Sequence, residues 1–295
     1  MPRGLYSRAA VNAIIIGAPI ILTLDMTDGH PLFVFDHIPK TAGTTFRRSY
    51  LIAAFSRDER WILSGGSSNA DDIERFLRLP EERRRRIRIV AGHQAENLRE
   101  RFPAARFLTV VRDPIERITS SYLHALFHEG SEGLWPDVRE QQMDLRRFAL
   151  KYEVPNMQSA RLLGSGTFTE GEMRERLRSR YALVGCTEAF DQFVFMLHIR
   201  EQFPLCFYNN RLVRRERETY TPSVSDLAFL RDLHAQDMTL HCVVRAEFQR
   251  QVDDLSAGSR ARMATYLQGL ERFRRESGGD PAQSVRLDPD ADWTI

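Results

Sequence analysis

The chain has 295 residues, of which 42% are hydrophobic and 28% charged, a composition that suits one large globular domain with a substantial core. The formal net charge is +2, so the charge balance favours neither nucleic acid nor a membrane surface as a partner. Only two of the 42 basic residues, Lys40 and Lys151, are lysine. This arginine bias reflects genome composition more than chemistry and points to a bacterial source. Because arginine is the default basic residue of this chain, the lysine at position 40 indicates that this position requires lysine.

Residues 9–24 form a largely apolar run that has some features of a signal peptide or membrane anchor. The run is shorter than the roughly 20 residues that a membrane-spanning helix needs, and Asn12 and Pro19 interrupt it. We therefore expect an extra strand or packed segment in a soluble protein, with a membrane anchor as the alternative. One domain is predicted over residues 1–295, with an N-terminal extension over 1–30 and a flexible, acidic tail over 276–295.

The next apolar run, Leu32–Phe35, predicts a buried strand. It leads through a turn that contains a glycine and several hydroxyl groups into a helical pattern, which we expect over Thr44–Phe55. Such a turn brings backbone N–H groups and the positive end of the helix dipole to one point, and this geometry binds phosphate. Thr44 or Thr45 would cap the helix or donate to a phosphate oxygen, and Lys40 adds a mobile positive charge.

This turn differs from the usual triphosphate-binding loop, in which the lysine follows the second of two glycines. Here Lys40 stands three residues before the only glycine, Gly43. A loop this short suits one phosphate-sized group better than a triphosphate. An ordinary strand–helix turn with threonine caps is the alternative interpretation.

A second strand–helix unit follows the same plan. Phe107–Val111 predicts a buried strand, and Pro114 suits the first turn of the helix after it. Arg112 stands at the carboxyl end of the strand, where ligands bind in open α/β sheets. Ser120 lies eight residues further on, about two helical turns away. The planar fork of an arginine together with a hydroxyl suits a terminal phosphate monoester.

A third apolar run, Ile87–Ala91, predicts another buried strand and ends at His93. A single histidine is usually structural, but this one stands at the edge of the sheet that should carry the ligand. His37 is the competing histidine, and we expect it to brace the loop that follows it. The arginine-rich segment 81–88 is interpreted as a solvated helix end, with a grip on an anionic substrate as the alternative.

The remaining pattern alternates helices with one more strand. Trp135 could equally stack on a sugar or pack in its loop, and Asn156 and Arg161 could approach a ligand. The predicted helices are Asp71–Leu79, Gln141–Tyr152, Asn156–Leu163, Glu170–Ser179, Glu188–Gln202, 226–255 and 257–275, the strand is Tyr181–Gly185, and the loops are Ser64–Asn69, His128–Asp137 and Phe207–Arg217. This alternation predicts a three-layer α/β sandwich with a central, mainly parallel sheet.

The three cysteines, Cys186, Cys206 and Cys242, are odd in number and far apart. They show neither metal-ligand spacing nor a disulfide framework. Each is expected to be a buried apolar residue in a protein from a reducing compartment, which predicts a cytoplasmic location.

The motifs together resemble those of a known family. HIPKTAGTTF, residues 37–46, closely resembles the 5′-phosphosulfate-binding loop of sulfotransferases, most of all the branch of the heparan sulfate 2-O- and 6-O-sulfotransferases. VVRDPIERITSSY, residues 110–122, resembles the 3′-phosphate-binding segment of that family. Weaker similarity at residues 156–164, 181–188 and 233–240 extends the resemblance over about residues 31–255, in the family's order.

The resemblance implies a P-loop, nucleotide-kinase-like sulfotransferase fold and 3′-phosphoadenosine-5′-phosphosulfate (PAPS) as co-substrate, with no metal required. It implies a strand-end histidine, His93, as catalytic base and Lys40 as the residue that stabilises the leaving group. The residues expected to hold the two phosphate positions are Lys40, Thr41, Ala42, Gly43, Thr44 and Thr45 for the 5′ group, and Arg112 and Ser120 for the 3′ group.

The expected function is therefore transfer of a sulfuryl group from PAPS to a hydroxyl, most naturally on a carbohydrate such as a polysaccharide, oligosaccharide or glycolipid. One alternative is a small-molecule kinase of the same fold, which would carry a Gly-Lys-Ser/Thr loop and acidic metal ligands. The other is a catalytically silent protein that binds a sulfonucleotide or glycan, which would lack Lys40 or His93.

Overall fold

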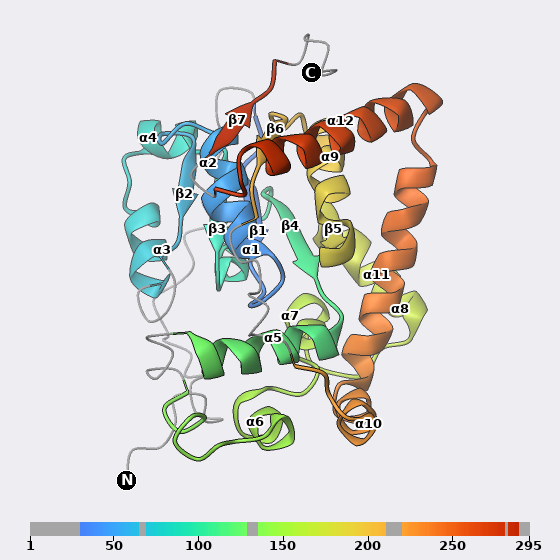
Figure 1. Cartoon of the computed structure of the whole chain (residues 1–295). Helices are drawn as coiled ribbons and strands as arrows, with labels where there is room; N and C mark the ends of the chain where they lie inside the picture. The colour runs from blue at the N-terminus through green and yellow to red at the C-terminus, as the bar shows by residue number, and fades with distance from the viewer. Residues whose placement is uncertain (1–29, 65–68, 129–134, 211–219, 281–282, 289–295) are drawn as a thin grey trace.

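The computed structural model describes residues 30–64, 69–128, 135–210, 220–280 and 283–288 (Figure 1). Five strands form one parallel sheet in the order β2-β3-β1-β4-β5. Their bounds are Phe33–Asp36 for β1, Arg60–Ile62 for β2, Ile89–Gly92 for β3, Arg106–Val111 for β4 and Leu183–Cys186 for β5. The apolar runs thus correctly predicted four of the five strands. The edge strand β2 was missed because it is short and only half-buried.

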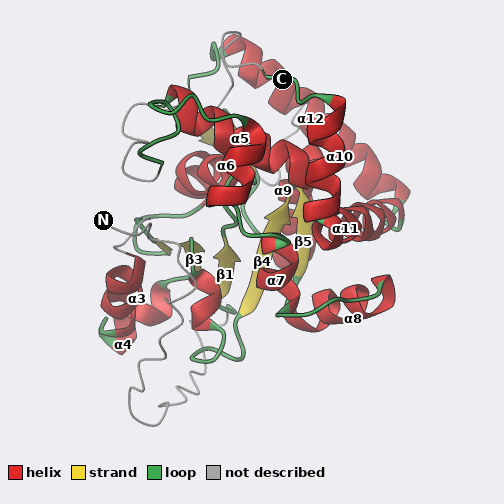
Figure 2. Cartoon of the chain, turned by 90° about the horizontal axis from the view of Figure 1, so that it is seen from below, coloured by secondary structure: helices red, strands yellow, loops and turns green. Residues whose placement is uncertain are grey.

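Helices cover both faces of this sheet, and Figure 2 shows the strands lying between them. One face of β1, through Phe33 and Phe35, packs with the helix after β1 and with α9 and α12. The other face, through Val34, packs with α3, α7, α8 and α11. The predicted three-layer α/β sandwich with a parallel central sheet is confirmed.

The helix bounds are α1 Gly43–Thr45, η2 Phe46–Tyr50, α2 Leu51–Ala54, α3 Asn69–Leu77, α4 Glu81–Arg86, η4 Ala95–Leu98, α5 Pro114–Phe127, α6 Leu145–Tyr152, α7 Met157–Leu163, α8 Glu170–Arg180, η6 Thr187–Ala189, α9 Phe190–Glu201, α10 Val224–Leu233, α11 Ala235–Asp253 and α12 Ala257–Glu276.

A smaller core lies beyond the carboxyl ends of the strands. Figure 1 shows the arrow of β4 pointing toward α5, which crosses below the sheet with α6 and α10 nearby. These three helices bury Ile118, Phe148 and Leu230 against one another. Trp135 packs at the margin of this core, with its ring 6.1 Å from that of Phe148. The carboxyl edge of the sheet therefore lies under a helical layer.

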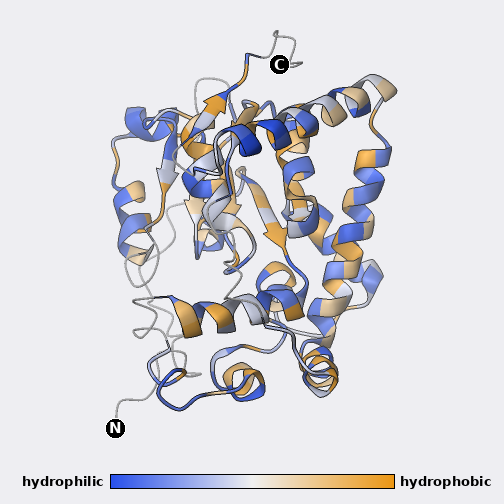
Figure 3. Cartoon of the chain, in the orientation of Figure 1, coloured by the Kyte–Doolittle hydropathy of each residue, from blue (hydrophilic) through white to orange (hydrophobic). Residues whose placement is uncertain are grey.

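Figure 3 shows hydrophobic residues gathered on the strands, whereas α4 is hydrophilic along its length. None of its residues is buried. Two of its arginines, Arg85 and Arg86, pair with glutamates one turn earlier in the same helix, as in the 2.6 Å contact between Arg86 and Glu82. Segment 81–88 is thus a solvated helix for most of its length, as expected.

Two predicted irregular segments contain strands instead. β6 (Cys206–Tyr208) pairs antiparallel with β7 (Ser284–Arg286), so the prediction of a loop from Phe207 and of a flexible tail over 276–295 was wrong at these positions. Phe207 and Tyr208 are buried against α12, which holds β6 in place as the pairing partner of β7. The short sequence of β7 does not by itself indicate a strand. Residues 211–217 of that loop, residues 289–295 of the tail and the apolar run 9–24 lie outside the described residues.

Smaller corrections concern a helix start and a cysteine. The helix expected from Gln141 begins only at Leu145, because Asp144 accepts the backbone N–H of Arg147 as its cap. Cys186 and Cys206 are buried as predicted, but Cys242 is exposed.

The buried ion pair between Arg117 and Glu153 gives a test of the small core. The two side chains are 1% and 9% exposed and 2.6 Å apart. Glu153→Ala leaves a buried guanidinium without its counter-charge and should lower the free energy of unfolding by about 3–5 kcal/mol. Urea denaturation measures this loss. In the exposed pair with Arg86, Glu82→Ala should cost less than about 1 kcal/mol, and equal losses for the two variants would contradict the assignment.

Candidate active site

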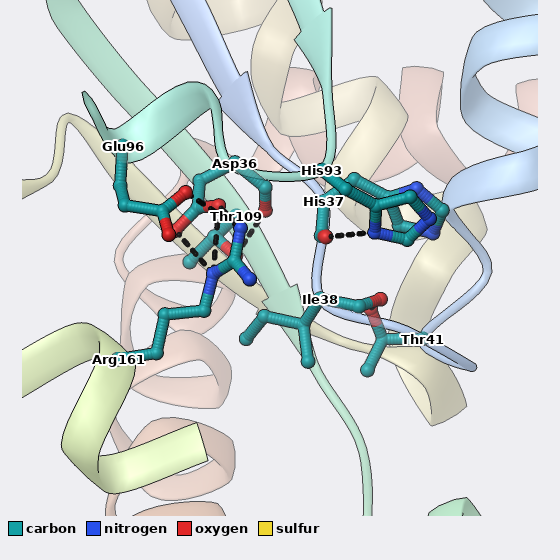
Figure 4. Close-up of polar contacts among 8 residues, drawn as sticks. All are labelled: Asp36, His37, Ile38, Thr41, His93, Glu96, Thr109 and Arg161. Carbon is teal, nitrogen blue, oxygen red and sulfur yellow. Dashed lines mark hydrogen bonds and ion pairs between the residues drawn. The ribbon is translucent and has the colours of Figure 1, made fainter. Parts of the chain in front are cut away.

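The turn after β1 adopts a strained backbone. Lys40 and Ala42 both have left-handed conformations, with φ angles of 67° and 60°. Each such non-glycine residue costs of the order of 1 kcal/mol and persists only where its surroundings hold it. The Thr41 hydroxyl, fully buried, donates to the Ile38 carbonyl at 2.8 Å and closes the turn (Figure 4). The Thr41 hydroxyl thus makes its hydrogen bond within the loop.

The helix after this turn begins without a side-chain cap. Ala42 is its N-cap residue, and its carbonyl accepts the first helical N–H, that of Phe46, at 3.1 Å. The expectation that Thr44 or Thr45 caps the helix was wrong, because the helix starts earlier, at Gly43, and both threonines lie inside its first turn. The N–H groups of Gly43 and Thr44 have no partner within the helix. This start of a helix suits an anion.

Gly43 is fixed by its contact with His37. A Cβ atom on Gly43 would lie 1.8 Å from the Cδ2 atom of His37, whose side chain is almost completely buried. Only glycine therefore lets the helix start approach the end of β1 so closely. The contact fits the bracing role expected for His37.

His93 stacks on His37, with the ring centroids 4.0 Å apart and the planes 24° from parallel (Figure 4). The Nδ1 atom of His93 lies 2.8 Å from the His37 carbonyl oxygen. Because a carbonyl only accepts, Nδ1 carries the hydrogen and Nε2 keeps its lone pair. Burial, and then the charge of Arg47, lowers the pKa of His93 to about 4. The ring is therefore neutral near pH 7 and can accept a proton at Nε2.

A charged cluster supports this histidine pair (Figure 4). Arg161 donates through Nε to Oδ1 of Asp36 at 2.9 Å and through Nη2 to Oε2 of Glu96 at 2.6 Å. Asp36 precedes His37 at the end of β1, and Glu96 lies three residues after His93. Burial and the charge of Asp36 raise the pKa of Glu96 to about 7. The cluster thus ties α7 to both segments that carry the histidines.

The two motifs expected to bind phosphate meet through Arg112. Its Nη1 donates to the Lys40 carbonyl at 3.3 Å across 72 residues of sequence. The side-chain amide of Gln158 bonds both the N–H and the carbonyl of Arg112, at 3.0 and 2.8 Å, and so fixes its backbone. Ser120 lies half-buried on α5, the helix that Arg112 precedes. The loop at Lys40 and Arg112 therefore lie at neighbouring strand ends, and Ser120 lies about two turns into the helix that follows Arg112.

Asn156 has a structural role. Its Oδ1 accepts the backbone N–H groups of Gln236 and Asp237, at 3.0 and 3.2 Å, at the start of α11. These two hydrogen bonds hold the start of α7 against the start of α11. The sequence pattern did not indicate this structural role of Asn156.

A further histidine, His124 on α5, was missed by the sequence analysis. Burial and then the charge of Lys40 lower its pKa to about 4. Its ring lies 4.1 Å from that of His128 and 5.7 Å from that of Trp135. His124 is therefore a second neutral histidine near Lys40. No signal in the sequence marks it, because it lies within an amphipathic helix, in the last turn of α5.

Two features are absent from the residues that the structure describes. Over these ranges, three or more histidine, cysteine, aspartate or glutamate side chains nowhere gather in a way that would hold a metal ion. Likewise, none of the helices described is at once long and apolar enough to cross a membrane.

Comparison with known proteins adds one finding. A family model described as "Sulfotransferase family" matches residues 23–242. This range includes the loop at Lys40, the strand end at His93, the segment from Arg112 to Ser120, and Arg161. Among curated proteins, none matches the chain.

The low pKa of His93 predicts an effect of pH on stability. The folded protein holds this pKa near 4, against 6.5 for an unperturbed histidine. Between these values the unfolded chain binds a proton that the folded protein does not, so stability falls as the pH drops through this window, by about 2 kcal/mol at pH 5. Urea denaturation of the wild type and His93→Asn at pH 7 and pH 5 should show a drop that is smaller by this amount in the variant. Equal drops would contradict the assignment.

Proposed function

The chain belongs to the sulfotransferase family, and from this premise we propose that it transfers a sulfuryl group from PAPS to a hydroxyl of a carbohydrate acceptor. The observation that carries the proposal is the contact between Arg112 and the Lys40 carbonyl. It joins two anion-binding motifs on strands that pair directly, since Asp36 of β1 is in register with Thr109 of β4. Paired strands lie about 4.8 Å apart, so the two motifs suit one small ligand with two phosphate positions.

PAPS is such a ligand, because its ribose carries a 3′-phosphate and a 5′-phosphosulfate. The open helix start at Gly43 and Thr44, with Thr45 and the backbone of Thr41 and Ala42, would hold the 5′ group. Arg112 and Ser120 would hold the 3′-phosphate through charge-assisted hydrogen bonds. The loop lacks the Gly-Lys-Ser/Thr pattern of a triphosphate-binding loop, which argues against the kinase alternative.

The chemistry follows from charge and position. His93 takes the proton of the acceptor hydroxyl at Nε2, while that oxygen attacks sulfur and the bond from sulfur to the bridging oxygen breaks. Lys40 stabilises the negative charge that develops on the bridging oxygen. A positioned base of this kind contributes roughly a hundred- to ten-thousandfold in rate. The sulfuryl group carries less charge than a phosphoryl group, so the proposal requires no metal ion.

The donor is tested by calorimetric titration with 3′-phosphoadenosine-5′-phosphate, with ATP and Mg²⁺ as the comparison. The proposal expects tight binding of the first nucleotide and little binding of the second. Binding of ATP alone would favour the kinase. Retained nucleotide binding without transfer to any glycan of a broad panel would favour the silent binding protein.

The 3′-phosphate site is tested by Arg112→Ala. Loss of hydrogen bonds to a charged group costs about 1.5–3 kcal/mol, so the affinity for 3′-phosphoadenosine-5′-phosphate should fall roughly 10- to 150-fold in calorimetry. Adenosine 5′-phosphosulfate, which lacks the 3′-phosphate, is the matched control and should bind the variant within about twofold of the wild type. Equal losses for both nucleotides would refute this assignment.

The base is tested by comparing His93→Ala with His124→Ala. We expect His93→Ala to lower transfer from labelled PAPS by about a hundredfold or more, with binding of the nucleotide product unchanged. His124→Ala should retain transfer within about tenfold, because the base is intact. The reverse pattern would assign the base to His124.

A further inference from the structure

Arg161 is paired with more negative charge than it can neutralise. Its guanidinium donates to Asp36 at 2.9 Å and to Glu96 at 2.6 Å (Figure 4). Elsewhere in the chain a buried arginine is neutralised by one carboxylate, as in the pair of Arg117 with Glu153 at 2.6 Å. When both of its carboxylates are ionised, the charged cluster of Asp36, Glu96 and Arg161 therefore carries one surplus negative charge.

This surplus charge lies in a poorly exposed place. The side chains of Asp36, Glu96 and Arg161 are 0%, 27% and 15% exposed. Two carboxylates in such surroundings repel each other, which favours a bound proton on one of them. Burial, and then the charge of Asp36, raises the pKa of Glu96 to about 7. Because the side chain of Glu96 keeps some contact with solvent, it can exchange this proton with water.

The chain path links the charged cluster to the histidine pair. Glu96 lies on η4, three residues after His93, and Asp36 immediately precedes His37. Gln94 has a left-handed backbone, with a φ angle of 60°, and η4 after it contacts β1. A change of charge at Glu96 is therefore close to the proposed base without any contact between the two side chains.

The charges around His93 come from several elements. Burial and Arg47 lower its pKa, and Arg161 acts in the same direction. Arg47 is buried on η2 and has no carboxylate partner in the described part of the chain. The hydrogen bond to the His37 carbonyl and the charge of Asp36 raise the pKa of His93. The affinity of the ring for a proton therefore depends on how far Arg161 neutralises Asp36.

Two further groups lie close to the cluster. Arg99 stacks between Phe107 and Tyr181, 3.8 and 4.9 Å from the ring centroids. It donates to the Arg180 carbonyl at 2.7 Å and forms no ion pair among the described residues. Burial, and then the charge of Asp36, raises the pKa of Tyr181, so its hydroxyl stays protonated. The response of the cluster near neutral pH therefore comes from Glu96.

We propose that Glu96 is a positioning residue for the proposed transfer, and that its ionised carboxylate, acting through Arg161, favours the protonated form of His93. This inference rests on the proposed function, in which His93 takes the proton of the acceptor hydroxyl. As that proton arrives, the surplus negative charge of the cluster stabilises the imidazolium. The acceptor proton goes to His93 alone, and Glu96 exchanges protons only with solvent. Once Glu96 is protonated the surplus charge is lost, and transfer slows.

The first test follows the ring nitrogens of His93 by NMR in the full chain, labelled with nitrogen-15 histidine. The signals are assigned by their loss in His93→Asn. In the wild type we expect a step in their chemical shifts centred near pH 7, where Glu96 ionises, while the ring itself stays neutral. Glu96→Gln should abolish this step. A wild-type titration without such a step would overturn the inference, and this result needs no variant to fold.

The second test measures the pH dependence of transfer from labelled PAPS to the glycan of the panel that accepts sulfate fastest. The wild-type kcat should fall about 3- to 10-fold between about pH 8 and pH 6, with KM nearly unchanged. Glu96→Gln should have the low kcat at both pH values. Glu96→Asp should keep part of the pH dependence, because it keeps the charge. Glu100→Gln removes an exposed carboxylate four residues further on and, as the matched control, should behave as the wild type.

The pattern across these variants decides the role of Glu96. A Glu96→Gln variant that keeps the wild-type pH dependence excludes Glu96 as its source. Loss of activity by the same factor at every pH assigns Glu96 a structural role only and also overturns the inference. Failure of the wild type to bind 3′-phosphoadenosine-5′-phosphate or to transfer sulfate would contradict the proposed function itself. The NMR step is measured without donor or acceptor and separates the two failures.

Discussion

The ion pair between Asp36 and Arg161 holds the active region together. Asp36 is fully buried at the last position of β1, where a carboxylate without a counter-charge would be strongly destabilising. Arg161, on α7, supplies that charge and also pairs with Glu96. Three segments far apart in the sequence therefore converge at one point: the strand before the Lys40 loop, the turn after His93, and α7. The positions of the loop and of the proposed base depend on this convergence.

The site combines fixed cations with neutral histidines. Burial first, and then the neighbouring His93 and the charges of Arg47, Arg161 and Lys40, keep the pKa of His37 well below its ordinary value. Burial, Arg47 and Arg161 do the same for His93, whereas its bond to the His37 carbonyl opposes them. An anionic ligand bound among these cations would oppose their effect on His93 and raise its basicity. Binding of the proposed doubly phosphorylated donor would thus be linked to the strength of the proposed base.

The success of the strand predictions has a simple physical reason. Strands that are buried on both faces of a parallel sheet are continuous apolar runs, and Leu32–Phe35 and Phe107–Val111 are such runs. β2 lies at an edge and β7 is mostly exposed, so neither carries a distinctive pattern. The error at Thr44 and Thr45 was one of helix register, because a left-handed Ala42 allows the helix to begin before them.

The sequence by itself determined the family, the two motifs proposed to bind phosphate and the strand-end position of His93, because these depend on residues that are neighbours in the chain. Only the tertiary structure decided that Arg161 pairs with Asp36 across 125 residues, that His124 lies near Lys40, and that Arg47 is buried without a carboxylate among the described residues. Contacts of this kind arise when separate elements pack. The charge state of a histidine or the isolation of a guanidinium depends on the burial and neighbours that packing creates.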